Sequence, residues 1–155
     1  MTMMSLELRI PPPVVLLLCA LAMWLVALWL PLGLWPSPAL TALGGVLAAA
    51  GVALIAAAML TFHRSRTTVN PLKPAESALV VSHGVFARTR NPMYVGLAMI
   101  LTGWACYLAN AVAWLGVPLF VAYITRFQIV PEERILHGKF GAPFAQYLAQ
   151  VRRWI

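Results

Sequence analysis

Two polar blocks contain the residues most able to support chemistry. The first, residues 83–96, reads His-Gly-Val-Phe-Ala-Arg-Thr-Arg-Asn-Pro-Met-Tyr-Val-Gly. The second, residues 131–136, reads Pro-Glu-Glu-Arg-Ile-Leu, with Phe-Gly at 140–141 and a tyrosine at 147 beyond it. Glu132 and Glu133 are two of only four acidic residues in the chain. Beside a low-dielectric surface, they would interact strongly with a cationic or hydroxyl-bearing ligand. They could instead cap a helix and pair with Arg88, Arg90 or Arg126.

The other polar residues of these blocks have two readings each. Arg88 and Arg90 serve either a ligand or the anchoring of a span, and His83 is either a loop histidine or a base. A metal site is not expected, because the three histidines show no ligand spacing and the chain has no aspartate. Cys19 and Cys106 form no metal-type spacing and are interpreted as small apolar packing residues.

The elements that must position these blocks are membrane helices. Hydrophobic residues make up 62% of the chain and charged residues 10%, against about 25% charged residues in a typical soluble domain. Residues 10–62 and 91–125 contain no Asp, Glu, Lys, Arg or His. Because one span needs roughly 20 apolar residues, we predict an all-α integral membrane fold with about four spans. The predicted spans are 14–30, 39–62, 92–109 and 111–130, the last two forming a hairpin that turns near 108–111.

The remaining segments are a connecting loop and a C-terminal helix. Residues 63–90 are polar and basic, and the prolines at 71 and 74 exclude one continuous helix through the first half of this loop. An amphipathic helix is predicted to follow Pro131 and to be interrupted near Gly141 and Pro143. The chain is expected to be a single domain whose site segments are about 70–96 and 131–155.

The basic residues are all predicted at one membrane face. All eleven Lys and Arg fall in the N-terminal lead, the 63–90 loop, the end of span four or the C-terminal tail. By the positive-inside rule, both termini and the loop are cytoplasmic, in a multi-pass protein of the inner membrane. The two polar blocks then lie close together at this face.

Three other readings of the composition are weaker. A net charge of +7 suggests nucleic acid, but the basic residues follow the positive-inside pattern and no nucleic-acid partner is expected. A cleaved signal peptide is disfavoured because the apolar run over 14–30 is long and no clear Ala-x-Ala site follows it. A transporter is disfavoured because no ionisable residue falls at mid-membrane.

The two blocks resemble the isoprenylcysteine carboxyl methyltransferase and phospholipid methyltransferase superfamily. Its pattern reads roughly Gly-x-Tyr-x-x-x-Arg-His-Pro-x-Tyr-x-Gly, then Glu-Glu-x-x-Leu, Phe-Gly, and a tyrosine before a basic end. The residues that match the first part are Gly84, Phe86, Arg90, Asn91, Pro92, Tyr94 and Gly96. Those that match the second are Glu132, Glu133, Leu136, Phe140, Gly141 and Tyr147, followed by Arg152 and Arg153. The resemblance covers about Thr67 to the C-terminus.

The resemblance implies transfer of a methyl group from S-adenosyl-L-methionine at the cytoplasmic face. No Gly-x-Gly-x-x-Gly motif supports a Rossmann-type cofactor site instead. The implied cofactor-binding residues are Leu79, Val80, Val81, His83, Gly84, Phe86, Asn91, Pro92, Met93, Tyr94 and Glu132. Glu133 and Arg90 are the implied catalytic residues, with Glu133 or His83 as a base if the acceptor is an amine.

The implied acceptor is a lipid or small apolar molecule carrying a carboxylate, an amine or a thiol. Asn91 and Phe86 stand where many members of the superfamily have His and Tyr. Arg126 and Gln128 are the expected substrate-binding residues. Gln128 occupies the position where prenylcysteine-processing members have an arginine suited to a substrate carboxylate, which argues against a prenylcysteine substrate. The alternative function is a non-catalytic membrane protein that binds lipid or a partner through its basic face.

Overall fold

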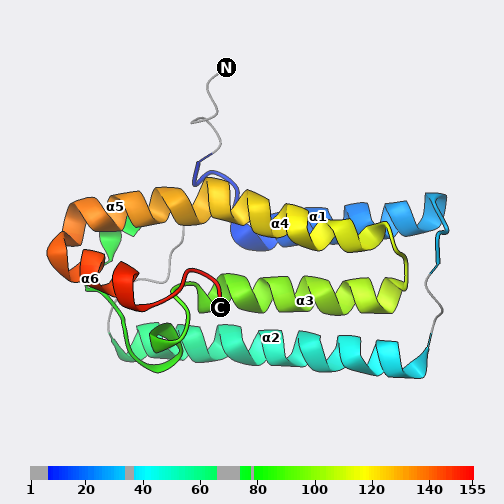
Figure 1. Cartoon of the computed structure of the whole chain (residues 1–155), viewed down its shortest axis with the longest axis horizontal. Coiled ribbons are helices and arrows are strands. Elements are labelled where there is room, and N and C mark those ends of the chain that lie inside the picture. The colour runs from blue at the N-terminus through cyan, green and yellow to red at the C-terminus, as the bar shows by residue number, and fades with distance from the viewer. Residues whose placement is uncertain (1–6, 34–36, 66–73, 78) are drawn as a thin grey trace, which may run out of the picture.

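The computed structural model describes residues 7–33, 37–65, 74–77 and 79–155. Helices make up 77% of it, and no strand occurs in these residues, so the all-α prediction is confirmed. The helices α1, α2, α3 and α4 lie lengthwise beside one another (Figure 1). The first part of the predicted loop, residues 66–73, and Ala78 lie outside the described residues.

The first two helices follow the uncharged stretches of the sequence. Helix α1 is Pro12–Trp29. Proline suits its first turn, because the N–H groups there have no acceptor within the helix and the N–H that proline lacks costs no hydrogen bond. Helix α2 is Pro38–Arg64 and is capped by Ser37, whose hydroxyl oxygen accepts a 3.1 Å hydrogen bond from the Leu40 N–H. Helix α1 begins within the three prolines at 11–13, two residues before the predicted start of the first span at 14.

The third helix ends in the predicted hairpin turn. Helix α3 is Pro92–Leu108, and Ala109 follows it in the left-handed region with φ of 46°. Asn110 is buried, and its side-chain oxygen accepts hydrogen bonds from the N–H groups of Val112 and Ala113. Its amide nitrogen donates to the Leu30 carbonyl at 2.7 Å, so the two uncharged turns are joined at one end of the bundle.

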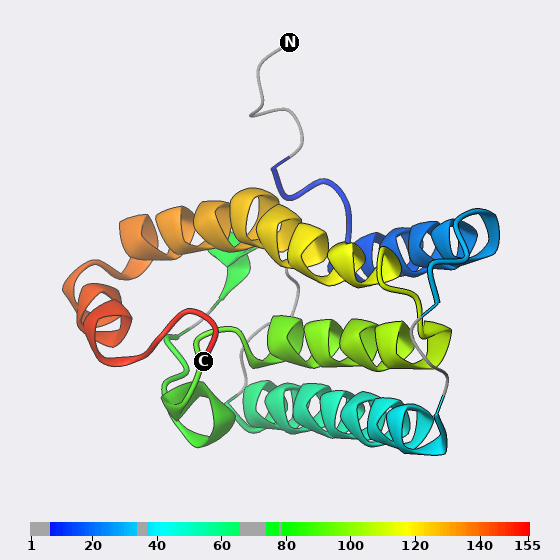
Figure 2. The same ribbon diagram turned by 45° about the vertical axis from the view of Figure 1, so that its right-hand side comes forward.

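The last helices form one long rod that extends past the others (Figures 1 and 2). It consists of η4 (Ala113–Leu115), α4 (Gly116–Ile124), the π-helical turn η5 (Thr125–Ile129) and α5 (Val130–Phe140). The predicted new helix after Pro131 is therefore a continuation of span four. A proline here frees the carbonyl of Phe127 four residues earlier, and the Leu8 N–H donates to that carbonyl at 3.0 Å.

The expected interruption near Gly141 is confirmed. Gly141 has a φ of +60°, which favours glycine, and α6 (Ala142–Gln150) folds back from there toward the start of α3 (Figure 2).

The fold is that of an integral membrane protein. Pro12–Trp29, Pro38–Arg64 and the stretch Ala113–Phe140 are long and apolar enough to cross a membrane, and α3 is a shorter apolar helix of 17 residues. Large apolar side chains are exposed on α1 and α2, including Leu17 at 67% and Val46 at 65%. Such exposure along whole helices suits contact with lipid, not water.

Small residues hold α2 against α3. A Cβ atom added to Gly44 would lie 2.6 Å from the Gly103 carbonyl oxygen, and one added to Gly51 would lie 2.5 Å from that of Gly96. Glycines at these positions allow the backbones of α2 and α3 to approach each other closely.

Candidate active site

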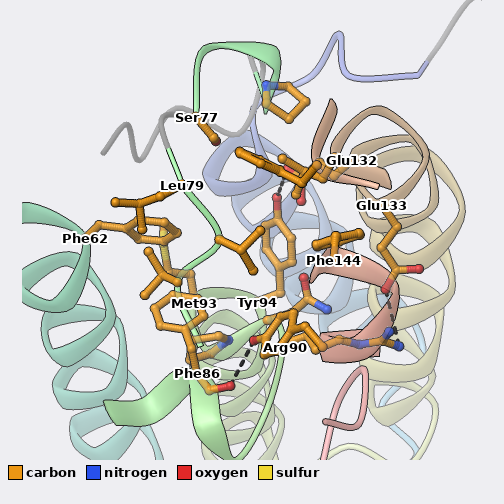
Figure 3. Close-up of a pocket in the computed structure, with 18 residues that line it drawn as sticks. Phe62, Ser77, Leu79, Phe86, Arg90, Met93, Tyr94, Glu132, Glu133 and Phe144 are labelled. Atoms are coloured by element: carbon orange, nitrogen blue, oxygen red, sulfur yellow. Dashed lines mark hydrogen bonds and ion pairs between the residues drawn. The ribbon is translucent and has the colours of Figure 1, made fainter. Parts of the chain in front are cut away.

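A pocket lies at the end of the bundle where α2 ends and α3 begins (Figure 3). It holds about 890 Å³ of atom-free space, a figure that includes the open solvent at its mouth. The lining residues are Phe62, Pro74, Ser77, Leu79, Val80, Val81, Phe86, Arg90, Asn91, Pro92, Met93, Tyr94, Glu132, Glu133, Leu136, Phe140, Phe144 and Tyr147.

Most of the residues that the sequence singled out for a site meet in this pocket. Nine of the eleven expected cofactor-binding residues line it, namely Leu79, Val80, Val81, Phe86, Asn91, Pro92, Met93, Tyr94 and Glu132. The two expected catalytic residues, Glu133 and Arg90, line it as well. The hairpin of α3 with the α4–α5 rod thus brings the two polar blocks together.

Glu132 is a half-buried acid of the pocket lining. It accepts a 2.6 Å hydrogen bond from the Tyr94 hydroxyl, and no cation of the described residues pairs with it. A carboxylate with one hydrogen-bond donor and no cation beside it suits a positive charge or a hydroxyl group of a ligand.

Tyr94→Phe tests the hydrogen bond to Glu132. Phenylalanine keeps the ring and its packing but leaves the carboxylate without its described donor. We expect binding of a cationic ligand to weaken by about 3–10-fold, since one intramolecular hydrogen bond contributes roughly 0.5–1.5 kcal/mol net. Ligand titration followed by tryptophan fluorescence measures it. Tyr107→Phe, on an exposed ring outside the pocket, is the control, and equal affinities of the two variants would remove Tyr94 from the site.

Glu133 is held by two guanidinium groups. Arg153 donates to it from Nε at 3.2 Å and from a terminal nitrogen at 2.7 Å, and Arg90 lies 3.4 Å from the same carboxylate. The Arg90 Nε is buried and has no hydrogen-bond partner in the described part of the chain. Glu133 therefore serves as an anchor for cations more readily than as a free base, while Arg90 retains one unused donor.

Aromatic side chains form the apolar wall of the pocket. The ring of Phe86 meets that of Phe62 edge-on at 4.8 Å between centroids. The Tyr147 hydroxyl donates to the Phe86 carbonyl at 2.8 Å, which ties α6 to η3 (Gly84–Ala87). An aromatic wall beside two carboxylates suits a ligand that is part heteroaromatic and part charged.

Two of the expected cofactor residues lie outside the pocket lining. The His83 ring nitrogen Nε2 lies 3.5 Å from the Ser65 hydroxyl oxygen, at an exposed position. Gly84 has a φ of +61° and faces the side chain of Thr61. Both residues shape the turn that brings η3 to the end of α2, and neither reaches the pocket surface.

The two expected substrate residues also lie outside the lining. Arg126 pairs with Glu7 at 2.8 Å, and its guanidinium lies over the Phe127 ring. Gln128 is buried at 1% exposure and donates to the Ile10 carbonyl at 2.7 Å. Ile10 is followed by three prolines, which have no backbone N–H to donate to its carbonyl. The Gln128 side-chain amide donates to that carbonyl instead.

Four lining residues were not named individually as site residues from the sequence, namely Phe62, Pro74, Ser77 and Phe144. Of these, only Phe62 lies outside the predicted site segments 70–96 and 131–155. Phe62 was interpreted as the end of an apolar span and Phe144 as one apolar member of the last helix. Phe62 could have been found from the change from apolar to basic residues directly after it. This change marks the end of a span at the face where the two polar blocks lie.

The fold and the pocket define an all-α integral membrane protein with a partly polar pocket at one end of its helices. Residues 39–142 match the family model described as phospholipid methyltransferase, so the chain belongs to that family and to the isoprenylcysteine and phospholipid methyltransferase superfamily. The resemblance seen in the sequence is thereby confirmed.

The other comparisons add little about function. A protein of Haemophilus influenzae, described as uncharacterized, is 46% identical over 63 residues, which is 41% of this chain and the whole of the relative. No solved structure matches.

Proposed function

We propose that this chain is a methyltransferase that uses S-adenosyl-L-methionine and acts on a lipid or small apolar acceptor. The observation that carries the proposal is the polar content of one aromatic-lined pocket. Glu132 is a half-buried carboxylate without a cation partner in the described residues, and Arg90 has a buried Nε–H without a described acceptor. Family membership supports membrane methyl transfer in general, and the pocket supports the choice of cofactor.

The residues fit the chemistry of this cofactor. It carries an ammonium and a carboxylate at one end, an adenine at the other, and a sulfonium and a ribose between them. Glu132 suits the ammonium or the ribose hydroxyls, the Arg90 N–H suits the carboxylate, and the wall of Phe62 and Phe86 suits the adenine. When bound, the cofactor would supply an electrophilic methyl group whose bonding electron pair stays on sulfur.

The chain's own contribution is positioning in a dry pocket. The apolar lining excludes water, and holding the two reactants in line supplies much of the rate of a displacement reaction. A carboxylate or thiolate acceptor needs no base. An amine acceptor must lose a proton, and Glu132 is the proposed base in that case, because Glu133 is paired with Arg153 and Arg90 and His83 lies outside the lining.

The proposed setting is the cytoplasmic face of the inner membrane. The described basic residues lie at the pocket end of the bundle, and none lies at the end where Asn110 joins the two turns. The positive-inside rule then puts the pocket in the cytoplasm, where the cofactor is made, and the spans beside it are in contact with the lipid acceptor.

Methyl transfer from labelled cofactor tests this function directly. Purified protein in detergent is incubated with S-adenosylmethionine carrying a labelled methyl group and a total membrane lipid extract, and lipid products are separated. We expect label in one or a few lipids, and none when Glu132→Ala protein is used. Label in no lipid and no small acceptor, together with intact lipid binding by both proteins, would favour the non-catalytic alternative.

A further inference from the structure

The last residues of the chain form a strap across the pocket end of the bundle, here called the C-terminal strap (residues 152–154). Its backbone accepts three hydrogen bonds from residues 89–91, directly before α3. The Arg90 N–H donates to the Arg152 carbonyl at 2.9 Å, and the Asn91 amide donates to the Arg153 carbonyl at 2.9 Å. The Thr89 hydroxyl also reaches the Arg153 carbonyl, at 3.4 Å.

The side chains of the strap reach the opposite wall. Arg153 binds both oxygens of Glu133 at the start of α5, and the Trp154 indole N–H donates to the Thr125 hydroxyl at 3.1 Å. Trp154 also packs against the main apolar core. The C-terminal strap thus joins α3, η5 and α5, the elements that carry the two polar blocks.

The position of Glu133 decides whether Arg90 has a donor to spare. Arg153 occupies both Glu133 oxygens, and Arg90 reaches one of them through a terminal nitrogen at 3.4 Å while its Nε stays without a partner. Without Arg153, the Glu133 carboxylate is free to rotate and to form a bidentate ion pair with Arg90, through Nε and a terminal nitrogen. That pair would consume the donor that a ligand carboxylate needs.

We propose that Arg153 is a positioning residue that holds Glu133 so that it reaches Arg90 through one terminal nitrogen only, which leaves the Arg90 Nε–H available to the carboxylate of the cofactor. The proposal rests on the function proposed above and adds a role for the strap. It predicts a selective effect, because only ligands with an amino-acid end use the Arg90 donor.

Titration with two ligands tests the role of Arg153. S-Adenosylhomocysteine has the amino-acid end, and 5′-methylthioadenosine lacks it. In Arg153→Ala we expect affinity for the first to fall about 10-fold, the loss of roughly one charge-assisted hydrogen bond, and affinity for the second to change less than about 2-fold. Arg153→Lys should restore part of the loss, because lysine keeps the charge without the two-pronged geometry.

Two further variants make the test specific. Arg152→Ala removes the same charge from the neighbouring exposed side chain and should leave both affinities unchanged. In a Glu133→Gln background, Arg153→Ala should add little, because Arg153 acts through Glu133. Equal losses for both ligands, or a loss in Arg152→Ala equal to that in Arg153→Ala, would overturn the positioning role. Failure of the wild type to bind either ligand would instead count against the proposed function.

Discussion

Replacing Glu132 with alanine should reduce the affinity for S-adenosylhomocysteine by about 30-fold or more. Glu132 is half-buried and has only the Tyr94 hydroxyl as a described partner, so a ligand cation would meet a carboxylate that no described cation already binds. Removing one partner of such a buried charge pair costs about 2–5 kcal/mol, which corresponds to this loss in binding. Calorimetric titration of both proteins in the same detergent measures it.

Glu7→Gln is the matched control for this substitution. It removes one negative charge from the same end of the molecule, where Glu7 pairs with Arg126 and Arg134 outside the pocket lining. Its affinity should stay within about 2-fold of the wild type, since charge pairs near the surface contribute roughly 0–1 kcal/mol. If the two variants bind equally well, Glu132 does not recognise the ligand.

Replacing Gly44 with valine should prevent correct packing of α2 on α3. A Cβ atom at Gly44 would lie 2.6 Å from the Gly103 carbonyl oxygen and 3.0 Å from the Cys106 Cβ atom. Because the first contact is with backbone, the helices must separate, at a cost of about 1–3 kcal/mol or more. We expect a lower yield of monodisperse protein and a lower melting temperature, and with the packing we expect ligand binding to be lost.

Gly45→Val separates packing from helix propensity. Gly45 is the next residue of the same helix, and a Cβ atom there meets nothing within 4 Å. Because the chemical change is identical and the neighbours are absent, this variant should express and melt like the wild type. A melting temperature for Gly44→Val that equals that of Gly45→Val would show that the close contact between α2 and α3 does not support the fold.

The helices could be predicted because their cause is local. The uncharged stretches, the prolines near Pro12 and Pro92, and Asn110 at the hairpin are all readable from the sequence, and the helices lie within about two residues of the first three predicted spans. The continuation of span four into α5 was missed. Pro131 suggests a break, and only the contact of the Leu8 N–H with the Phe127 carbonyl, across the fold, removes that cost.

The site could be predicted as a set of residues but not as a network. The two polar blocks flank one hairpin, so their meeting followed from topology, and most of the expected residues line one pocket. Their partners depend on long-range geometry. The pairing of Glu133 with Arg153 and the pairing of Arg126 with Glu7 join distant parts of the chain, and no spacing in the sequence distinguishes them from other charge pairs.

Titration of S-adenosylhomocysteine into the purified wild-type protein tests the central claim most directly. The pocket holds a half-buried carboxylate, a buried guanidinium donor and an aromatic wall, and together these predict saturable binding of about one ligand per chain. Competition by S-adenosylmethionine for the same site is part of the expected result. Absence of any binding up to millimolar ligand, in protein that is monodisperse and folded, would contradict the claim that this pocket is a cofactor site.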